Sequence, residues 1–231
     1  EGAGFVPIGD DTNIFTGTLN GNGHVISNLY INNPSNAALF YRFENGTIEN
    51  LEIDHASIHG DPVAATLAAV AYNAHIHDVI VHDSTVESTG TDVINSASGG
   101  LVAMLSNYST IERSSFDGAV TGRQKVGGLV GWSSGSSNIL EDTYARATVS
   151  GLTDVGGLVG RLQGGDIYIS YAAGTVSASG DSNEAWAGGL IGYITDSNNH
   201  TISSTFADTS ISSAEEDKLL VGYTEDPSMI D

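Results

Sequence analysis

The sequence predicts an all-β fold, a parallel β-solenoid of about seven coils with repeats of roughly 30 residues. The first observation is a glycine-flanked motif that recurs along the chain. Its central leucines, spaced 28 to 34 residues apart, are Leu39, Leu67, Leu101, Leu129, Leu158, Leu190 and Leu220. The second is that further short β-type segments follow the motif in most repeats, separated by Gly, Ser, Asn and Asp turns. One such repeat cannot bury its own apolar face, so neighbours must stack in parallel, in a right- or left-handed coil.

The recurring motif is Gly-Gly-Leu-Val-Gly, with its clearest copies beginning at Gly99, Gly127, Gly156 and Gly188. Leu-Val is too short and too β-branched for a helix, so the motif indicates a short strand. Its glycines indicate that the backbone approaches a neighbouring backbone closely. A weaker copy lies in the alanine-rich run from Val63 to Tyr72, which we interpret as a diverged coil.

The repeats divide the chain into one domain of stacked coils. Asn20–Gly23 is expected to form the sharp corner of the first coil. After a lead-in at 1–14, the expected coils are about 15–45, 46–74, 75–109, 110–138, 139–166, 167–200 and 201–231.

The motif followed by Thr-Ile-x-x-Ser-Tyr/Phe resembles the GLUG-type repeat of large secreted and surface proteins of microbes. The segment from Phe15 to Leu29 resembles the opening coil that often precedes such repeats. The resemblance covers about residues 4–223 and departs from the pattern at Ala65–Ala69 and at Lys218–Leu219. It implies a β-solenoid in an extracellular, adhesin-like protein, although repeat families carry unrelated roles on one scaffold.

The composition is strongly acidic, with 28 acidic and 7 basic residues and a net charge of −21. This argues against nucleic acid or an anionic membrane as a partner, because phosphate contacts need Lys and Arg. The acidity fits the solubility of an elongated surface protein, a marine or hypersaline habitat, or calcium binding in acidic turns. There is no cysteine, and no apolar run approaches the ~20 residues that a membrane-spanning helix needs.

A first candidate site is a group of histidines and aspartates between residues 54 and 83. Alignment of Ile53 with Val81 in adjacent coils gives the candidate metal ligands, with Asp54 beside His82 and His55 beside Asp83. Such a ladder suits a transition metal. The favoured alternative is a solvated column of electrostatically paired side chains, since no metalloenzyme spacing is present. Calcium remains open at Asp10–Asp11 and at 181–184, and no cofactor is required.

A second candidate site follows from strand alternation beside the motif. If the motif leucines point inward, the next column points outward and is wholly apolar: Phe40, Ala68, Val102, Val130, Val159, Ile191 and Val221. Beyond it stand Trp132, Arg161, Tyr193 and Tyr223, with Trp186 in a nearby loop, and we predict that these bind a ligand. The alternative is that the chain bends here and buries successive residues.

These observations predict a non-catalytic extracellular repeat domain of a microbial surface or secreted protein. It would act in adhesion, or in binding of a glycan or a host or neighbour-cell surface protein. Two alternatives remain, a polysaccharide-processing β-helix enzyme and a pure structural spacer. No catalytic residue is assigned, because basic residues are sparse and no Gly-x-Ser-x-Gly elbow occurs. The oligomeric state is left open.

Overall fold

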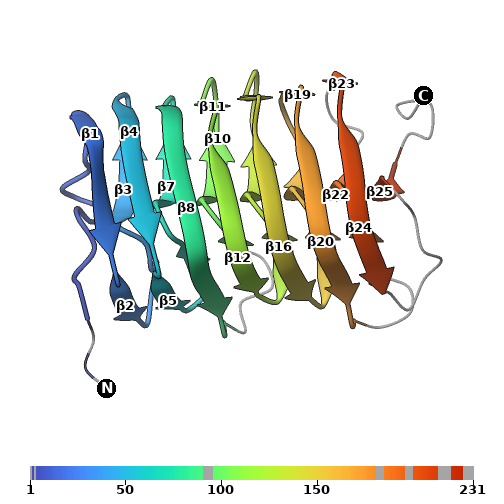
Figure 1. Ribbon diagram of the computed structural model, residues 1–231, viewed down its shortest axis with the longest axis horizontal. Coiled ribbons are helices and arrows are strands. Elements are labelled where there is room, and N and C mark those ends of the chain that lie inside the picture. Colours follow the sequence, from blue (N-terminus) through green and yellow to red (C-terminus); the bar gives the residue numbers. More distant parts are fainter. Residues whose placement is uncertain are drawn as a thin grey trace.

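The computed structural model describes residues 2, 4–90, 96–180, 185–195, 200–212 and 220–225. These residues form a parallel β-solenoid of about six turns, with the coils side by side from the N-terminal to the C-terminal end (Figure 1). The predicted fold class is therefore confirmed. Among the described residues there is no helix of a length and apolarity that would cross a bilayer.

Three sheets make up the wall of the solenoid, and each coil contributes strands to them in turn. The long sheet has thirteen strands: β1 (Thr18–Ser27), β2 (Tyr30–Asn33), β4 (Thr47–Asp54), β5 (Ser57–Gly60), β8 (His75–Ser88), β11 (Thr110–Glu112), β12 (Ser115–Thr121), β15 (Ile139–Glu141), β16 (Tyr144–Gly151), β19 (Asp166–Tyr168), β20 (Tyr171–Ala178), β23 (Ile202–Ser203) and β24 (Phe206–Ser212). The seven-stranded sheet has β3 (Phe40–Glu44), β7 (Ala68–Tyr72), β10 (Val102–Ser106), β14 (Val130–Ser134), β18 (Val159–Leu162), β22 (Ile191–Ile194) and β25 (Val221–Thr224). The five-stranded sheet has β6 (Val63–Ala65), β9 (Ala97–Gly99), β13 (Gln124–Gly127), β17 (Thr153–Gly156) and β21 (Ala187–Gly188).

The motif leucines stack on one another from coil to coil. The amide of Leu101 donates to the carbonyl of Leu129 at 2.9 Å, and the amide of Leu129 donates to Leu158 at 2.9 Å. The same bond joins Leu158 to Leu190 at 2.8 Å. The sequence period is thus the length of one coil, because equivalent residues of neighbouring repeats pair through their backbones.

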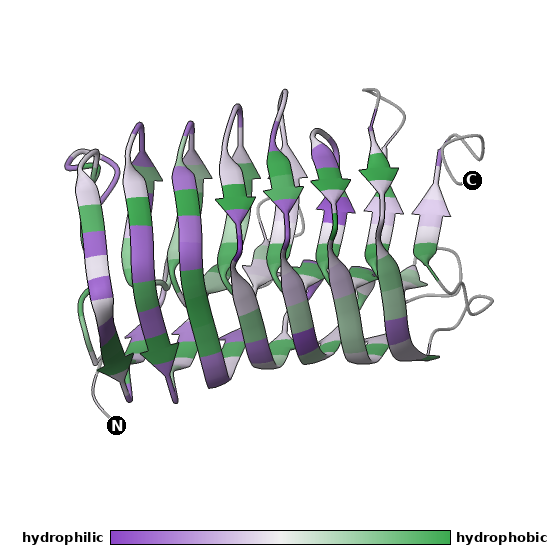
Figure 2. Cartoon of the chain, turned by 45° about the horizontal axis from the view of Figure 1, so that its top comes forward, coloured by the Kyte–Doolittle hydropathy of each residue, from purple (hydrophilic) through white to green (hydrophobic). Residues whose placement is uncertain are grey.

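The main core runs along the inside of the solenoid, and bands of hydrophobic and hydrophilic residues alternate along the strands (Figure 2). The column that includes Val130, Val159 and Ile191 lies in this core, and all three side chains are fully buried. The expectation that this column points outward is therefore wrong, and the alternative, that the chain bends here and buries successive residues, is confirmed. The chain bends at each motif between the five- and seven-stranded sheets, so Leu129 and Val130 both face the core and strand alternation fails there.

Two local expectations have different outcomes. The run from Val63 to Tyr72 does form a coil, as β6 and β7. The corner expected at Asn20–Gly23 is wrong: these residues lie within β1, whose pairing with β4 shifts register between Asn20 and His24. The extra residues form a bulge in β1. Within it, Gly21 packs against the backbone of Asn50 and Leu51 too closely for a side chain.

Candidate functional site

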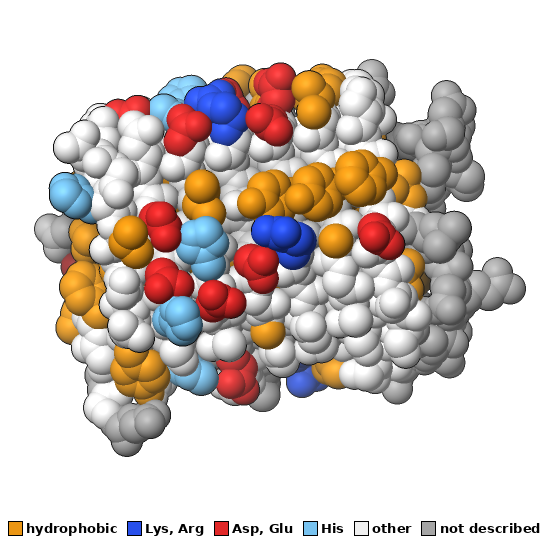
Figure 3. All heavy atoms as spheres, viewed as in Figure 1, with side chains coloured by type: hydrophobic (Ala, Val, Ile, Leu, Met, Phe, Trp, Pro, Cys, Tyr) orange, Lys and Arg blue, Asp and Glu red, His pale blue; other side chains and the backbone are white. Residues whose placement is uncertain are grey.

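The richest cluster of ionisable side chains lies on the outward face of the long sheet, over its N-terminal half. Figure 3 shows acidic and histidine side chains gathered there, whereas the C-terminal half of the same face carries few charges. Four of the seven histidines form ion-pair contacts with acids on this face, namely His55, His59, His77 and His82.

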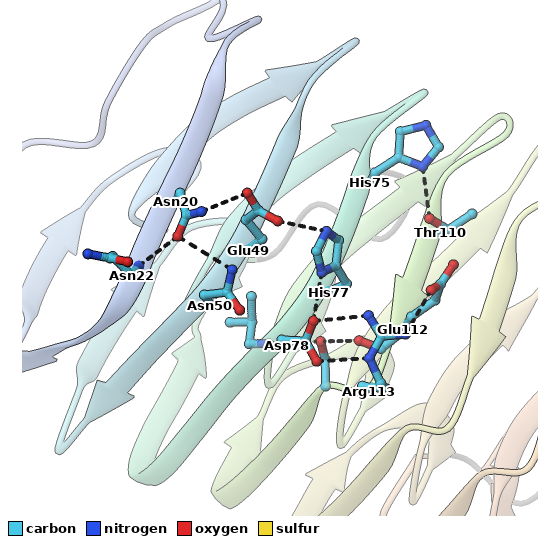
Figure 4. Close-up of polar contacts among 12 residues, drawn as sticks. Asn20, Asn22, Glu49, Asn50, His75, His77, Asp78, Thr110, Glu112 and Arg113 are labelled. Atoms are coloured by element: carbon cyan, nitrogen blue, oxygen red, sulfur yellow. Dashed lines mark hydrogen bonds and ion pairs between the residues drawn. The ribbon is translucent and has the colours of Figure 1, made fainter.

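His77 is the centre of a polar network that crosses the first strands (Figure 4). Its Nε2 lies 3.1 Å from Oε2 of Glu49, which stands opposite it on β4, and its Nδ1 lies 2.8 Å from Oδ2 of Asp78. Oε1 of Glu49 also accepts a hydrogen bond of 2.9 Å from the side-chain amide Nδ2 of Asn20 on β1. The network thus ties three coils together through side chains as well as through the backbone ladder.

Asp78 ends this network in a bidentate ion pair with Arg113. The guanidinium donates from Nε to Oδ1 at 2.8 Å and from Nη2 to Oδ2 at 3.0 Å. Hydrogen bonds from Arg113 and then from His77 lower the pKa of Asp78 to about 2. Both partners remain substantially exposed, so water screens the pair and its contribution to stability is small.

Replacement of Arg113 by alanine is expected to return the pKa of Asp78 toward its ordinary value of 3.8. A lowered native-state pKa stabilises the fold above the unfolded-state value, and that stability is lost as the pH falls toward 2. The variant should therefore be less stable than the parent protein above pH 3.8, and the difference should vanish as the pH falls toward 2. Carboxyl NMR titration measures the pKa, with Arg146→Ala as the control. An unchanged Asp78 pKa in Arg113→Ala would contradict the assignment.

The predicted metal ligands lie close together on the same face. Asp54 stands opposite His82, as the sequence alignment predicts. Ligand atoms of Asp54, His55 and Asp83 lie within 4.8 Å of one another, whereas His82 Nε2 instead lies 3.2 Å from Glu52 Oε1. One imidazole and two carboxylates form a donor set for a divalent transition ion. Three of the four residues are thus brought together, and metal binding stays a prediction.

The two acidic segments considered for calcium differ in what the structure shows. The carboxylate of Asp10 accepts hydrogen bonds from Thr12 and Asn13, which hold its pKa well below the usual range. This is the behaviour of a turn-forming aspartate. The segment 181–184 lies outside the described residues.

A third group, which the sequence analysis missed, consists of a serine, a histidine and a glutamate linked in the order found in the catalytic triads of hydrolases. Ser57 Oγ lies 3.1 Å from His59 Nε2, and His59 Nδ1 lies 3.3 Å from Glu87 Oε2. A cavity of about 480 Å³ is lined by His59 and Glu87, but Ser57 is not among its lining residues. The repeat spacing is the signal that could have found the group, since β5 pairs with β8 in register.

The predicted ligand-binding residues form one column of the seven-stranded sheet. Trp132, Arg161, Tyr193 and Tyr223 stand opposite one another in successive strands. They do not point freely into solvent, because each of the first three contacts a residue that lies in the five-stranded sheet or, for Tyr193, directly before its strand β21. The pairs are Lys125–Trp132, Asp154–Arg161 and Trp186–Tyr193. We call this line of facing residues the seam.

The contacts of the seam alternate between aromatic and charged pairs. The ammonium of Lys125 lies 4.8 Å from the ring centroid of Trp132, and Nε of Arg161 donates to Oδ2 of Asp154 at 2.6 Å. Trp186 packs 4.8 Å from both Tyr193 and Tyr223. Tyr223 remains 37% exposed, whereas Tyr193 is only 9% exposed. Ligand binding by this column stays a prediction, and its contacts within the chain are those of a packed interface.

Asp154 is the most deeply buried charge of the seam, with no exposed side-chain surface. Burial raises its pKa, and Arg161, the Thr153 hydroxyl and Lys125 oppose that rise. The two members of each pair are seven residues apart in sequence, one on either side of the motif. That constant spacing is a sequence signal for the seam.

One curated protein, of very great length, is similar to this chain in sequence. No family model matches it. It is 32% identical over 151 residues to halomucin of Haloquadratum walsbyi, a match that covers 63% of this chain and 1% of halomucin. The chain therefore spans about a hundredth of the length of the curated relative that it matches.

Two solved structures share the fold. One is a crystal structure from Bacteroides ovatus, provisionally named an immunoglobulin A1 protease, with a TM-score of 0.63 and 19% identity. It is matched over 89% of this chain and 68% of that chain. The other is an IgA1 protease, with a TM-score of 0.65 and 22% identity over 91% of this chain and 17% of that chain. At this identity the likeness shows a common solenoid and no common activity.

Proposed function

We propose that the chain is a non-catalytic, extracellular segment of a very large surface or secreted protein, and that it acts in adhesion by binding a glycan or another protein. The observation that carries this proposal is the 32% sequence identity to halomucin. The matched region makes up only 1% of the halomucin sequence, so halomucin is a very large protein. The name halomucin denotes a mucin of a salt-associated organism. A net charge of −21 suits such a setting, since salt screens the mutual repulsion of carboxylates.

The arrangement of side chains also supports binding over catalysis. The triad-like group lies on an exposed sheet face, with His59 and Glu87 side chains 39% and 48% exposed. Its serine is not among the residues that line the adjacent cavity. Catalysis needs a nucleophile and an oxyanion site converging on one bound atom. The likeness to the IgA1 proteases is one of fold and gives no reason to assign proteolysis.

The test is a paired binding and turnover experiment on residues 1–231. We expect retention on a glycan array or on a microbial cell surface, with no release of reducing ends, unsaturated uronates or peptides. A fluorophosphonate probe should not label Ser57, and Ser57→Ala should behave as the parent protein. Product release that is abolished by Ser57→Ala or by a single carboxylate substitution would overturn the proposal in favour of an enzyme. Absence of both binding and turnover would overturn it in favour of a spacer.

A further inference from the structure

The C-terminal half of the long sheet presents a second kind of surface, formed by β12, β16, β20 and β24. Their outward residues stand in register, so that each strand position forms a straight column across the coils. We call this surface the hydroxyl face. Two of its columns are Thr148, Thr175 and Ser210, and Thr121, Ser150, Ser177 and Ser212.

A ladder of aromatic rings borders the hydroxyl face. Tyr144, Tyr171 and Phe206 stack with successive ring centroids 5.0 Å apart and planes 7° apart. Figure 3 shows a hydrophobic stripe across this half of the surface. Phe206 is 57% exposed, so the ladder offers apolar surface to a partner. A contiguous exposed apolar stripe is characteristic of an interaction site.

The hydroxyl face has few charges on a chain with a net charge of −21. Its charged outward residues in the described strands are Asp117, Arg146 and Asp208, all in one column. Arg146 lies 3.5 Å from Asp117 and 5.3 Å from the Tyr144 ring, so its charge is partly neutralised. An uncharged partner suits this surface, whereas the rest of the protein repels a polyanion.

The surface also repeats at a fixed interval, the strand spacing of about 4.8 Å. A linear polymer that lies across the strands meets the same set of groups at every step. Hydroxyls that both donate and accept hydrogen bonds match the hydroxyl groups of sugars. The rings of the aromatic ladder, on the other side of the column of Asp117, Arg146 and Asp208, match the apolar C–H patches of sugars. A globular protein has no such regular repeat.

We propose that the hydroxyl face binds an uncharged polysaccharide that runs along the solenoid axis, across β16, β20 and β24. This inference rests on the proposed adhesive function and specifies its ligand and its surface. The surface differs from the column of Trp132, Arg161, Tyr193 and Tyr223 that the sequence suggested.

The test is affinity electrophoresis of residues 1–231 in gels that contain a soluble β-glucan, a mannan or a galactan, with a polyuronate gel for comparison. We expect retardation by at least one neutral polymer and none by the polyuronate. The double variant Thr148→Val/Thr175→Val keeps the side-chain shape and removes two hydroxyls, so it should weaken binding about tenfold. Tyr171→Ala should weaken it by a similar factor.

Thr18→Val is the matched control, because Thr18 is an exposed threonine on β1 of the same sheet and stands in a different column, opposite Thr47. It should bind within about twofold of the parent protein, a difference well below 1 kcal/mol. Binding of a neutral polymer that is unaffected by the Thr148/Thr175 variant would overturn the assignment of the face and leave adhesion standing. Stronger retardation by the polyuronate than by the neutral polymers would contradict an uncharged polysaccharide as the ligand. Attachment to cells that depends only on a cell-surface protein would contradict it as well. Absence of retardation in every gel would overturn the polysaccharide proposal alone. Absence of retention on the glycan array and on cells as well would overturn both proposals.

Discussion

Replacement of Gly128 by alanine is expected to lower the free energy of unfolding by at least about 3 kcal/mol, the upper range for overpacking of a buried site. An added Cβ would lie far inside van der Waals contact with the carbonyl oxygen of Gly157 in the next coil, and 2.8 Å from Cβ of Ala145. The first of these neighbours is backbone and cannot rotate away. The same contact recurs at Gly157 against Gly189, so Gly157→Ala should have a similar effect.

Gly17→Ala is the matched control, because the same added methyl group would lie 3.4 Å from the ring of Phe15, an ordinary contact. Urea denaturation followed by circular dichroism gives all three free energies. Equal losses in Gly128→Ala and Gly17→Ala would show that close stacking at the motif does not decide stability.

Replacement of Asp154 by alanine is expected to cost about 3–5 kcal/mol, as removal of one partner from a buried ion pair does. The guanidinium of Arg161 would lose its carboxylate, and the nearby Lys125, which is only 3% exposed, would lose a compensating charge. The double variant Asp154→Ala/Arg161→Met should recover part of the loss, since an apolar pair needs no charge compensation.

A double-mutant cycle measured by urea denaturation tests this pair, with Asp117→Ala as the surface comparison. Asp117 and Arg146 lie 3.5 Å apart and both are substantially exposed, so Asp117→Ala should cost less than about 1 kcal/mol. Strictly additive losses for Asp154 and Arg161 would mean that the two side chains do not act as a pair.

The sequence predicted the stacking of coils well, because the motif leucines of successive repeats pair through backbone hydrogen bonds and their spacing therefore equals the length of one coil. The pairing of Ile53 with Val81 and of Asp54 with His82 follows from that period and is confirmed. The direction of Val130 could not be predicted in the same way. Strand alternation holds within a strand, and the bend at each motif turns two successive residues into the core.

The candidate sites were predictable only where they lie within one sheet. Asp54, His55 and Asp83 come together because neighbouring coils are in register. The seam depends on which residues face each other across the bend at the motif. The ion pair of Asp78 with Arg113 depends on the direction of the chain just after the end of β11, where Arg113 lies. The spacing of residues in the sequence does not predict these contacts, because they depend on how the chain turns between strands.

The seam gives each coil a distinct identity within a nearly uniform array. Because the two members of a pair are only seven residues apart, each pair closes within its own coil, across the bend at the motif. The short connection between the two sheets prevents one from sliding past the other by a coil. A whole repeat could therefore be gained or lost without giving any seam residue a new partner within its own coil.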